Sequence, residues 1–272
     1  MFLRRKLTVM ATVALLSTSL LAGCSSSGGS SNGGSNGGGT ATAAEVLANK
    51  NARAAISMII DKQAYCDVIL NNGSIPTSTF TPKGLAFDNG KDYTDLTKGM
   101  GYEYNEEKAK ELWAKAKEEV GFDTVEIEIL TFDHDTGKRT GEFIQSELGD
   151  LEGLTAKVSN LPFEQKLERE TNGEFDLAFS GWGADYPDPL TYLSTMQTGN
   201  QFAKQVGYNS EDYNKLVEEA MKLPTSEGFA KYAEAEKLML EDGYLAPIYQ
   251  KAGAYLEKDY VSGIVNNSWG AD

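Results

Sequence analysis

Three stretches with the residue pattern of β-strands, separated by helical stretches, lie between residues 124 and 182. The first, "TVEIEIL", alternates apolar and polar residues, so Val125, Ile127 and Ile129 face a core from one side of a strand. The second and third strands are "LTAKVSN" and "EFDLAFSGW". A loop over residues 131–141 and a short helix at 143–148 separate the first pair, and a helix starting at Pro162 separates the second. This order predicts an α/β fold with a parallel or mixed sheet and flanking helices.

Helical patterns flank this region on both sides. The first runs from Ala43 to the Asn71-Asn72-Gly73 cluster. A connector rich in Pro, Gly and Asp follows over residues 74–101, and such a long irregular segment is uncommon unless it wraps a surface or shapes a site. Asn105 is a suitable N-cap for the next helix, which has an apolar face formed by Ala109, Leu112, Trp113, Ala116 and Val120. After the third strand we expect helices at residues 188–198, from residue 209 and at 226–241, then an extended segment at 244–250.

The N-terminus has the pattern of a secretory signal. Arg4, Arg5 and Lys6 precede an apolar run over residues 7–21, which is too short to span a bilayer comfortably. The ending Leu21-Ala22-Gly23-Cys24 resembles a bacterial lipobox, which predicts a signal peptide over residues 1–23 and lipidation of Cys24. An ordinary signal peptide with an incidental cysteine is the alternative. Residues 24–42 are rich in Gly and Ser and predict a flexible tether between a lipid anchor and a folded domain.

Charge and cysteine content limit the partners of the chain. The 272 residues carry a net charge of −15, which argues against nucleic acid and anionic headgroups and leaves cationic ligands or a basic partner. The length after the tether suits one large domain or two small ones. With Cys24 lipidated, Cys66 is the other of two cysteines, so neither an intramolecular disulfide nor a multi-cysteine metal site is expected. Cys66 is predicted to fill a core position on a helix, with a reactive thiol as the alternative.

Catalytic motifs are not recognisable in the sequence. His134 is the one histidine, lies between two aspartates and is expected in a solvated turn. No G-x-S-x-G elbow occurs, "TGKRT" lacks the leading glycine of a phosphate loop because Phe132 stands there, and "DHDTG" lacks the spacing of a calcium loop. Paired carboxylates for acid/base chemistry are not singled out among the 40 acids. We therefore expect neither an enzyme nor a cofactor or metal, and keep a surface hydrolase as a minor alternative.

The stretch "SGWGADYPDP", residues 180–189, is the strongest candidate for a ligand site. It begins where the third strand ends, and ligands of open α/β sheets gather beyond the carboxyl ends of the strands. Gly181 and Gly183 allow close approach of a ligand to the backbone, and Trp182 and Tyr186 offer flat apolar surfaces. The Asp185 carboxylate would favour an ammonium group.

A structural turn is the alternative reading of this stretch. For Asp188 and Pro189 we expect only a role in starting the next helix.

Four segments resemble the family 5 extracellular solute-binding proteins, the oligopeptide and dipeptide receptors of ABC importers. They are residues 51–65, including Ile59-Ile60-Asp61-Lys62, and residues 173–193, 207–220 and 245–250. The resemblance implies a type II periplasmic-binding-protein-like lobe in which Asp185 pairs with the α-amino group of a peptide. It also makes Gly181, Trp182, Gly183 and Tyr186 candidate peptide contacts.

The resemblance departs from the family pattern at the N-terminal side. Family members are about twice as long, and the tether here runs straight into what resembles their second lobe, over residues 43–246. Residues 247–272 resemble the return segment that normally crosses to the first lobe. We therefore expect a truncated receptor whose cleft has one wall, and such a cleft excludes water from a ligand poorly.

Several functions remain open on this sequence. The leading hypothesis is a lipid-anchored peptide-binding component at the outer face of a bacterial cell membrane, with short peptides, ABC permease and ATPase subunits and a separately encoded first lobe as partners. The alternatives are an interaction or peptide-sensing lipoprotein that docks a partner through the exposed inter-lobe face, and an inactive remnant.

Overall fold

The computed structural model of the protein describes residues 2–3, 39–253 and 256–264. Cys24, residues 4–23 and most of the expected tether lie outside these ranges. The described strands are β1 (Phe2–Leu3), β2 (Gly39–Ala41), β3 (Ile75–Pro76), β4 (Phe87–Asp88), β5 (Lys91–Asp92), β6 (Phe122–Phe132), β7 (Leu154–Leu161), β8 (Leu177–Ala178) and β9 (Tyr249–Gln250). The described helices are α1 (Ala43–Ala48), α2 (Lys50–Ile59), α3 (Lys62–Ala64), the π-helix η1 (Tyr65–Leu70), α4 (Thr94–Thr97), α5 (Glu106–Val120), α6 (Asp135–Leu148), α7 (Phe163–Asn172), α8 (Leu190–Leu193), the 3₁₀-helix η2 (Ser194–Met196), α9 (Gln201–Val206), α10 (Glu211–Ala220) and α11 (Thr225–Asp242).

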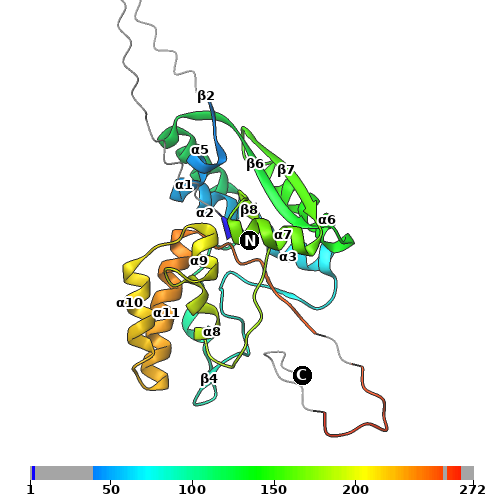
Figure 1. Ribbon diagram of the computed structural model, residues 1–272, viewed down its shortest axis with the longest axis vertical. Helices are drawn as coiled ribbons and strands as arrows, with labels where there is room; N and C mark the ends of the chain where they lie inside the picture. The colour runs from blue at the N-terminus through cyan, green and yellow to red at the C-terminus, as the bar shows by residue number, and fades with distance from the viewer. Residues whose placement is uncertain (1, 4–38, 254–255, 265–272) are drawn as a thin grey trace, which may run out of the picture.

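A five-stranded mixed sheet organises the fold, as the sequence predicts (Figure 1). Its centre is β6, which pairs in parallel with β7 along one side. On its other side β6 pairs in parallel with β2 near its start and with β8 near its end. Strand β1 adds to the outer edge of β8 in the antiparallel sense. Gly39–Ala41, which composition assigns to the tether, therefore belong to the sheet as β2.

One face of the sheet is buried along β6, whereas the opposite face is exposed at Glu126 and Lys157 and is buried near the end of β6 and at β8. Each buried area belongs to a separate hydrophobic cluster. Successive strand residues point to opposite faces. Ile129 and Leu177 accordingly join the cluster formed with α1, α2, α5 and α6, whereas Leu130 and Ala178 join the cluster formed with α8 to α11. Figure 1 shows the second group of helices gathered in the lower part of the molecule, below β6 and β7. Strand β8 consists of two apolar residues, Leu177 and Ala178, because it is buried on both faces.

Helix boundaries follow the capping residues. The predicted helix from Ala43 is divided because the Asn49 side chain accepts from the amides of Asn51 and Ala52 and starts α2 as a separate helix. The predicted end at Asn71 and the predicted N-cap Asn105, which accepts from the amide of Lys108 at 2.9 Å, are both confirmed.

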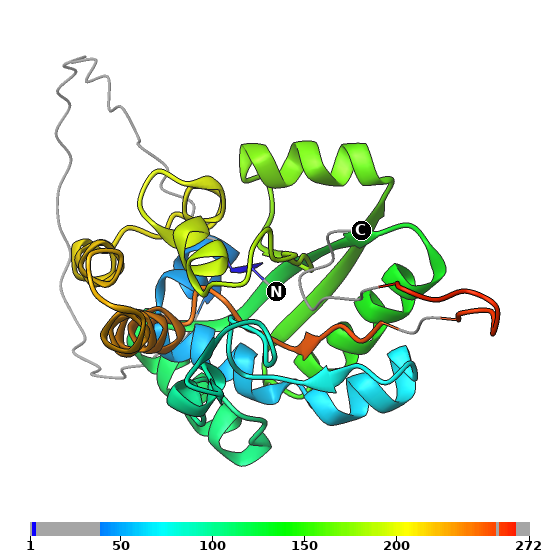
Figure 2. The ribbon, with the colours of Figure 1, turned by 90° about the horizontal axis from the view of Figure 1, so that it is seen from below.

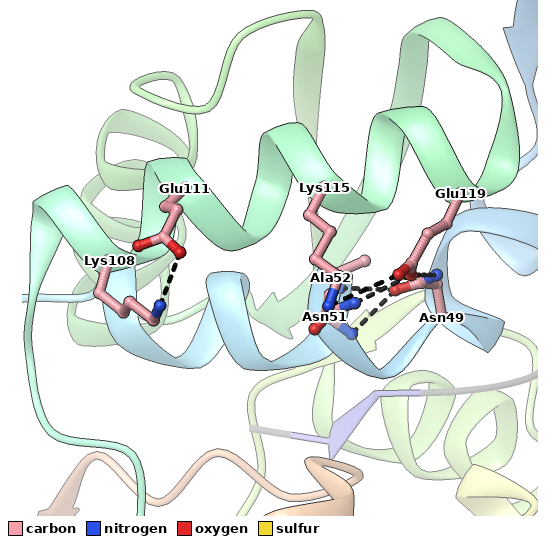
Figure 3. A network of polar contacts seen from close by, with 7 residues as sticks. All are labelled: Asn49, Asn51, Ala52, Lys108, Glu111, Lys115 and Glu119. Carbon is pink, nitrogen blue, oxygen red and sulfur yellow. Dashed lines mark hydrogen bonds and ion pairs between the residues drawn. The ribbon is translucent and has the colours of Figure 1, made fainter.

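The α2 and α5 helices are joined by a polar contact at one end (Figure 3). The Glu119 carboxylate on α5 accepts from the side-chain amides of Asn49 at 2.8 Å and Asn51 at 2.9 Å. Lys115 lies 3.7 Å from the same carboxylate. These contacts lower the pKa of Glu119, with the bond from Asn49 as the largest cause. The interaction fixes the α2 N-cap against the helix that covers it.

Helix α6 is longer than predicted. Residues 135–141 were expected in a loop, but α6 starts at Asp135 and the His134 ring is its N-cap, with Nδ1 accepting from the Gly137 amide at 3.0 Å. His134 itself is exposed and lies in a bend just before α6, so the solvated turn expected there is confirmed, whereas the loop expected over residues 135–141 is wrong. The His134 imidazole also stacks on Phe132, with ring centroids 5.3 Å apart.

The long connector wraps the helical half of the molecule, and a buried carboxylate holds it there. Glu236 on α11 is fully buried and accepts from the amides of Phe80 and Thr81 and from the hydroxyls of Thr81 and Tyr93, all within 3.1 Å. Strand β3 of the same connector pairs with β9, so the expected extended segment at 244–250 is docked at its end. Figure 2 shows these two short strands side by side.

None of the helices in the described ranges has the length and apolar character that crossing a membrane requires.

Candidate functional site

The loop of residues 180–189 leaves the carboxyl end of β8, as the sequence predicts. Strand β8 is shorter than expected: the predicted strand covered residues 174–182, but only Leu177 and Ala178 pair with β6. One more backbone bond, from the Phe179 amide to the Leu130 carbonyl at 2.9 Å, precedes the departure of the loop. The loop therefore begins beside the ends of the parallel strands β6 and β7.

Trp182 is anchored by its neighbours rather than standing free as a wall. Its indole Nε1 donates to the Thr191 carbonyl at 2.9 Å, and its own carbonyl accepts from the Tyr192 hydroxyl at 3.2 Å. The ring packs edge-to-face on Phe202, with centroids 5.5 Å apart. The side chain is half-buried, so it fixes the loop and still presents part of its surface.

Asp185 is held through its backbone while its carboxylate is exposed. The Asp185 amide donates to the Thr191 hydroxyl at 3.0 Å. Within the part of the chain that the structure describes, its carboxylate takes part in no hydrogen bond or ion pair. The negative charge of Asp185 acts on Tyr192. The pKa of the Tyr192 hydroxyl is raised to about 12, mainly by burial and to a smaller extent by the charge of Asp185. A fixed backbone with an unpaired carboxylate suits the binding of a cationic group.

Gly181 and Gly183 are not required by the fold. Neither has a left-handed φ, and a Cβ atom added at either position would meet nothing within 4 Å. Both residues are exposed. Open space therefore lies in front of this backbone edge, where an extended ligand could approach its N–H and C=O groups.

Tyr186 and Asp188 have different positions in the loop: Tyr186 is exposed, whereas Asp188 contacts the start of the next helix. Tyr186 is 41% exposed, and burial together with Asp188 and Asp185 raises the pKa of its hydroxyl. The Asp188 carboxylate accepts from the Leu190 amide at 2.8 Å and Pro189 is the N-cap of α8. The expected role of these last two residues in starting a helix is confirmed.

A pocket of about 210 Å³ opens beside the glycine edge. Four aromatic side chains line it, namely Phe132, Phe163, Trp182 and Phe202. Phe132 and Phe163 are stacked, with centroids 6.0 Å apart and planes inclined by 7°. Phe163 is 63% exposed, which is unusual for so large an apolar side chain. Apolar walls of this kind accept an aromatic or aliphatic group.

Polar groups also line the pocket. Glu170 is one of them, and it is buried in an ion pair with Lys166, whose Nζ also lies 4.2 Å from the centroid of the Phe132 ring. Burial lowers the pKa of Lys166, and the Glu170 charge opposes that change. Gln205, which is also buried, is a further polar lining residue. The pocket thus combines aromatic walls with a small number of hydrogen-bonding groups.

The sequence missed this pocket because its walls come from separate elements. Phe132 ends β6, Phe163 starts α7 and Phe202 lies in α9, a helix that was not predicted. One local signal existed. Phe163 and Leu167 lie four residues apart on α7, and both are exposed apolar residues on a helix with few others.

The remaining candidate residues have structural positions. Cys66 is buried on η1, as predicted, and burial with the nearby Asp67 raises the pKa of its thiol, which disfavours a reactive thiolate. Asp61 is the N-cap of α3, and its carboxylate accepts a hydrogen bond from the Ala64 amide. Lys62 donates to the Ser78 hydroxyl and the Tyr102 carbonyl. In the described ranges, no cluster of three or more His, Cys, Asp or Glu residues is arranged to hold a metal ion.

The sheet order and the flanking helices define a type II periplasmic-binding-protein-like lobe. The model of the bacterial extracellular solute-binding proteins, family 5, matches residues 29–204. The chain belongs to this family.

Several relatives are known. The dipeptide-binding protein of Lactococcus lactis is 31% identical over 235 residues, which cover 84% of this chain and 42% of that protein. Listeria monocytogenes OppA bound to peptide has a TM-score of 0.74 and 36% identity, covering 83% of this chain and 43% of that one. The pheromone receptor PrgZ has a TM-score of 0.72 and 33% identity, covering 83% and 44%. The chain spans about two-fifths of the length of the curated relatives that it matches.

Proposed function

We propose that this protein is a lipid-anchored peptide-binding component of an ABC importer, held by Cys24 at the extracytoplasmic face of the membrane. The observation that carries the proposal is the unpaired carboxylate of Asp185 next to an open backbone edge. The names of the relatives, which include a dipeptide-binding protein and a peptide-bound OppA, support the ligand class.

The ligand lies along the loop with its α-amino group at Asp185. The exposed backbone of Gly181 and Gly183 offers hydrogen bonds to an extended main chain. The aromatic pocket beside Gly181 receives one peptide side chain, while Tyr186 flanks the amine. Three parts of a peptide make contacts in this arrangement, namely the α-amino group, the main chain and one side chain. An amine without a peptide backbone should therefore bind far less tightly.

Tight binding needs a second lobe. Asp185, Gly181 and Gly183 are all exposed, and a charge pair in contact with water is weak. A second lobe that closes over the ligand would remove water and strengthen the amine–carboxylate contact. The described residues contain one such lobe, so we propose that a first lobe completes the cleft and that permease and ATPase subunits receive the closed complex.

The test is a two-by-two comparison of ligand and protein. The tripeptide Ala-Phe-Ala and its N-acetyl derivative are titrated by calorimetry into wild type and Asp185→Asn. If Asp185 pairs with the amine, either change alone lowers the affinity by up to about fivefold, the value of a charge pair exposed to water. Both changes together then lower it little further.

Asp123→Asn is the matched control, since Asp123 is an exposed acid near the opposite end of β6. It should leave the affinity unchanged. Full additivity of acetylation and Asp185→Asn would contradict the pairing.

A sensing role is the second candidate function, and the similarity to a pheromone receptor favours it. A sensor would bind peptide and then engage a partner protein through the exposed inter-lobe face, without driving uptake. Uptake of labelled peptide by cells with and without the protein separates the two functions. An inactive remnant would show neither peptide binding nor a partner.

A further inference from the structure

A groove of about 560 Å³ lies apart from the loop of residues 180–189. Its walls come from the start of α3, from the connector that leads to α5 and from Gln250 in β9. Of the described residues that line it, none belongs to that loop. The groove is therefore a separate candidate for a binding site.

Lys62 is a buried cation at this groove. It lines the groove although the residue is only 3% exposed. Its ammonium group donates to the Ser78 hydroxyl at 3.0 Å and to the Tyr102 carbonyl, and both acceptors are neutral. Among the described residues, no carboxylate forms an ion pair with Lys62. A buried charge without an opposite charge is unfavourable, and burial accordingly lowers the pKa of Lys62 to about 8, with the Glu103 charge opposing the change.

Lys62 and Ser78 together offer two hydrogen-bond donors to the groove. An ammonium group has three N–H donors, and Lys62 uses two of them. The Ser78 hydroxyl accepts from Lys62 and keeps its own O–H, for which the described part of the chain provides no acceptor. Ser78 is itself buried and lines the groove. The two oxygens of a carboxylate can accept from both donors at once.

A close contact between backbones fixes the position of Ser78. Gly101 packs so tightly on Ser78 that a Cβ atom at residue 101 would lie 1.7 Å from the Ser78 carbonyl oxygen. Glycine permits this approach because it has no Cβ atom. The hydroxyl of Ser78 is therefore held in place before a ligand arrives, which reduces the cost of ordering the site on binding.

The sign of the ligand charge follows from the burial of the charged groups. Asp61 also lines the groove, but its carboxylate accepts from the Ala64 amide within α3. The remaining charged side chains are exposed, and they are two lysines and two acids, namely Lys83, Lys98, Asp95 and Glu103. Water screens exposed charges, and these four balance one another. The buried ammonium group of Lys62 thus selects an anion.

Apolar side chains form another part of the wall. Ile75 and Tyr104 are 46% and 44% exposed, and Pro76 between β3 and the rest of the connector is exposed as well. Apolar walls with a few polar groups are typical of sites for small molecules. A ligand that combines an anionic group with an apolar body therefore fits the groove better than an inorganic anion does.

We propose that this groove binds a small carboxylic acid with an apolar body, whose carboxylate accepts hydrogen bonds from Lys62 and Ser78. The carboxylate supplies the negative charge that Lys62 lacks, and the apolar body covers Ile75 and Tyr104. This site goes beyond the proposed peptide-binding function and does not depend on it, because the groove and the loop of residues 180–189 share no residue.

Phenylacetate and its neutral isostere phenylacetamide are the probes that test the proposal. Each is titrated into the full chain while NMR spectra follow the backbone amide of Ser78. We expect phenylacetate to bind at least about tenfold more tightly than phenylacetamide, the lower value for a hydrogen bond to a charged group. Lys62→Met keeps the apolar stem and should remove this preference. Ser78→Ala should reduce the preference by about two- to tenfold, the range for one hydrogen bond, and it tests the site independently of the stability of Lys62→Met.

Lys83→Met is the matched control, because Lys83 is an exposed lysine of the same groove, and it should keep the preference. Inorganic phosphate, which has no apolar body, should bind more weakly than phenylacetate. The proposal would be overturned by the absence of a saturable shift with phenylacetate, by equal affinity for the two probes, by an unchanged preference in Lys62→Met and Ser78→Ala, or by phosphate binding as tightly. Asp185→Asn should leave phenylacetate binding unchanged, so failure of the peptide-binding role is distinguishable from failure of this site.

Discussion

The indole of Trp182 donates to the backbone carbonyl of Thr191, at 2.9 Å, and so ties the loop of residues 180–189 to α8, the first helix after it. The Thr191 hydroxyl accepts from the Asp185 amide at 3.0 Å. One buried threonine thus holds both the aromatic residue and the acid of the motif. The spacing between the open backbone edge and the Asp185 carboxylate depends on this residue.

Thr191→Val should weaken peptide binding without removing the site. The substitution deletes the acceptor for the Asp185 amide and keeps the carbonyl that holds Trp182. We expect the free energy of unfolding to fall by about 0.5–1.5 kcal/mol and the peptide affinity to fall by up to about tenfold, both within the range of one hydrogen bond. Urea unfolding and calorimetric titration measure the two effects.

Thr195→Val is the control for that substitution. Thr195 is also buried, and its hydroxyl donates to the Tyr192 carbonyl outside the loop. It should lower the stability similarly and leave the affinity unchanged. Equal affinities in all three proteins would show that Thr191 does not position the site.

Gly183→Val should separate affinity from stability. A Cβ atom at this exposed position would meet nothing within 4 Å, so the stability should change by no more than about 0.5 kcal/mol. The same side chain occupies the space of the peptide backbone, and the affinity should fall by at least about tenfold, or 1.4 kcal/mol. Gly39→Val, at a second glycine with open space, is the control and should not affect binding. Unchanged affinity in Gly183→Val would place the ligand elsewhere.

Lys62 should make stability depend on pH above neutrality. Burial lowers the pKa of Lys62 to about 8, with Glu103 opposing the change. Between pH 8 and the usual lysine range, the unfolded chain binds the proton that the folded chain has released, so stability contributed by this group rises with pH. The difference between wild type and Lys62→Met in urea unfolding should therefore move in favour of wild type by up to about 3 kcal/mol between pH 7 and pH 10.5.

Lys83→Met is the control, since Lys83 and Lys62 both line a groove of about 560 Å³ and Lys83 is exposed. The pH dependence of its stability should follow that of wild type. A Lys62→Met protein with an unchanged pH profile would mean that the ammonium group is solvated in the folded state.

Glu236→Ala should destabilise the helical half of the molecule. The carboxylate accepts from two backbone amides and two hydroxyls in the connector, and all four donors would lose their acceptor. We expect a loss of at least about 3 kcal/mol, because several buried donors are left unsatisfied. Glu241→Ala, an exposed acid on the same helix with a surface partner in Lys237, should change stability by less than about 1 kcal/mol. Similar losses in both variants would contradict a specific role for Glu236.

The local features of the fold were predictable where neighbouring residues determine them. The alternation in "TVEIEIL" identified β6, the side chain of Asn105 identified the start of α5, and Asp188 with Pro189 identified the start of α8. Each depends on contacts within about four residues. The loop of residues 180–189 was located in the same way, from its position after a strand.

Gly137 and Gly141 show why other features were not predictable. Their presence favoured a loop over residues 131–141, yet both lie in α6. A Cβ at Gly141 would lie 2.5 Å from the side chain of Val158, and one at Gly137 would lie 2.3 Å from the carbonyl of Phe132. These glycines allow a helix to pack closely on β6 and β7, which is a tertiary requirement that local propensity does not report.

The sequence by itself determined the α/β class and the family, because each is written in short runs of residues. The tertiary structure decided three things that such runs do not contain. It brought Phe132, Phe163 and Phe202 together as one pocket, made Trp182 an anchor of the loop, and buried the ammonium group of Lys62 against Ser78 and Tyr102. All three depend on packing between segments remote in sequence, and packing is fixed only when the whole sheet and its helices are in place.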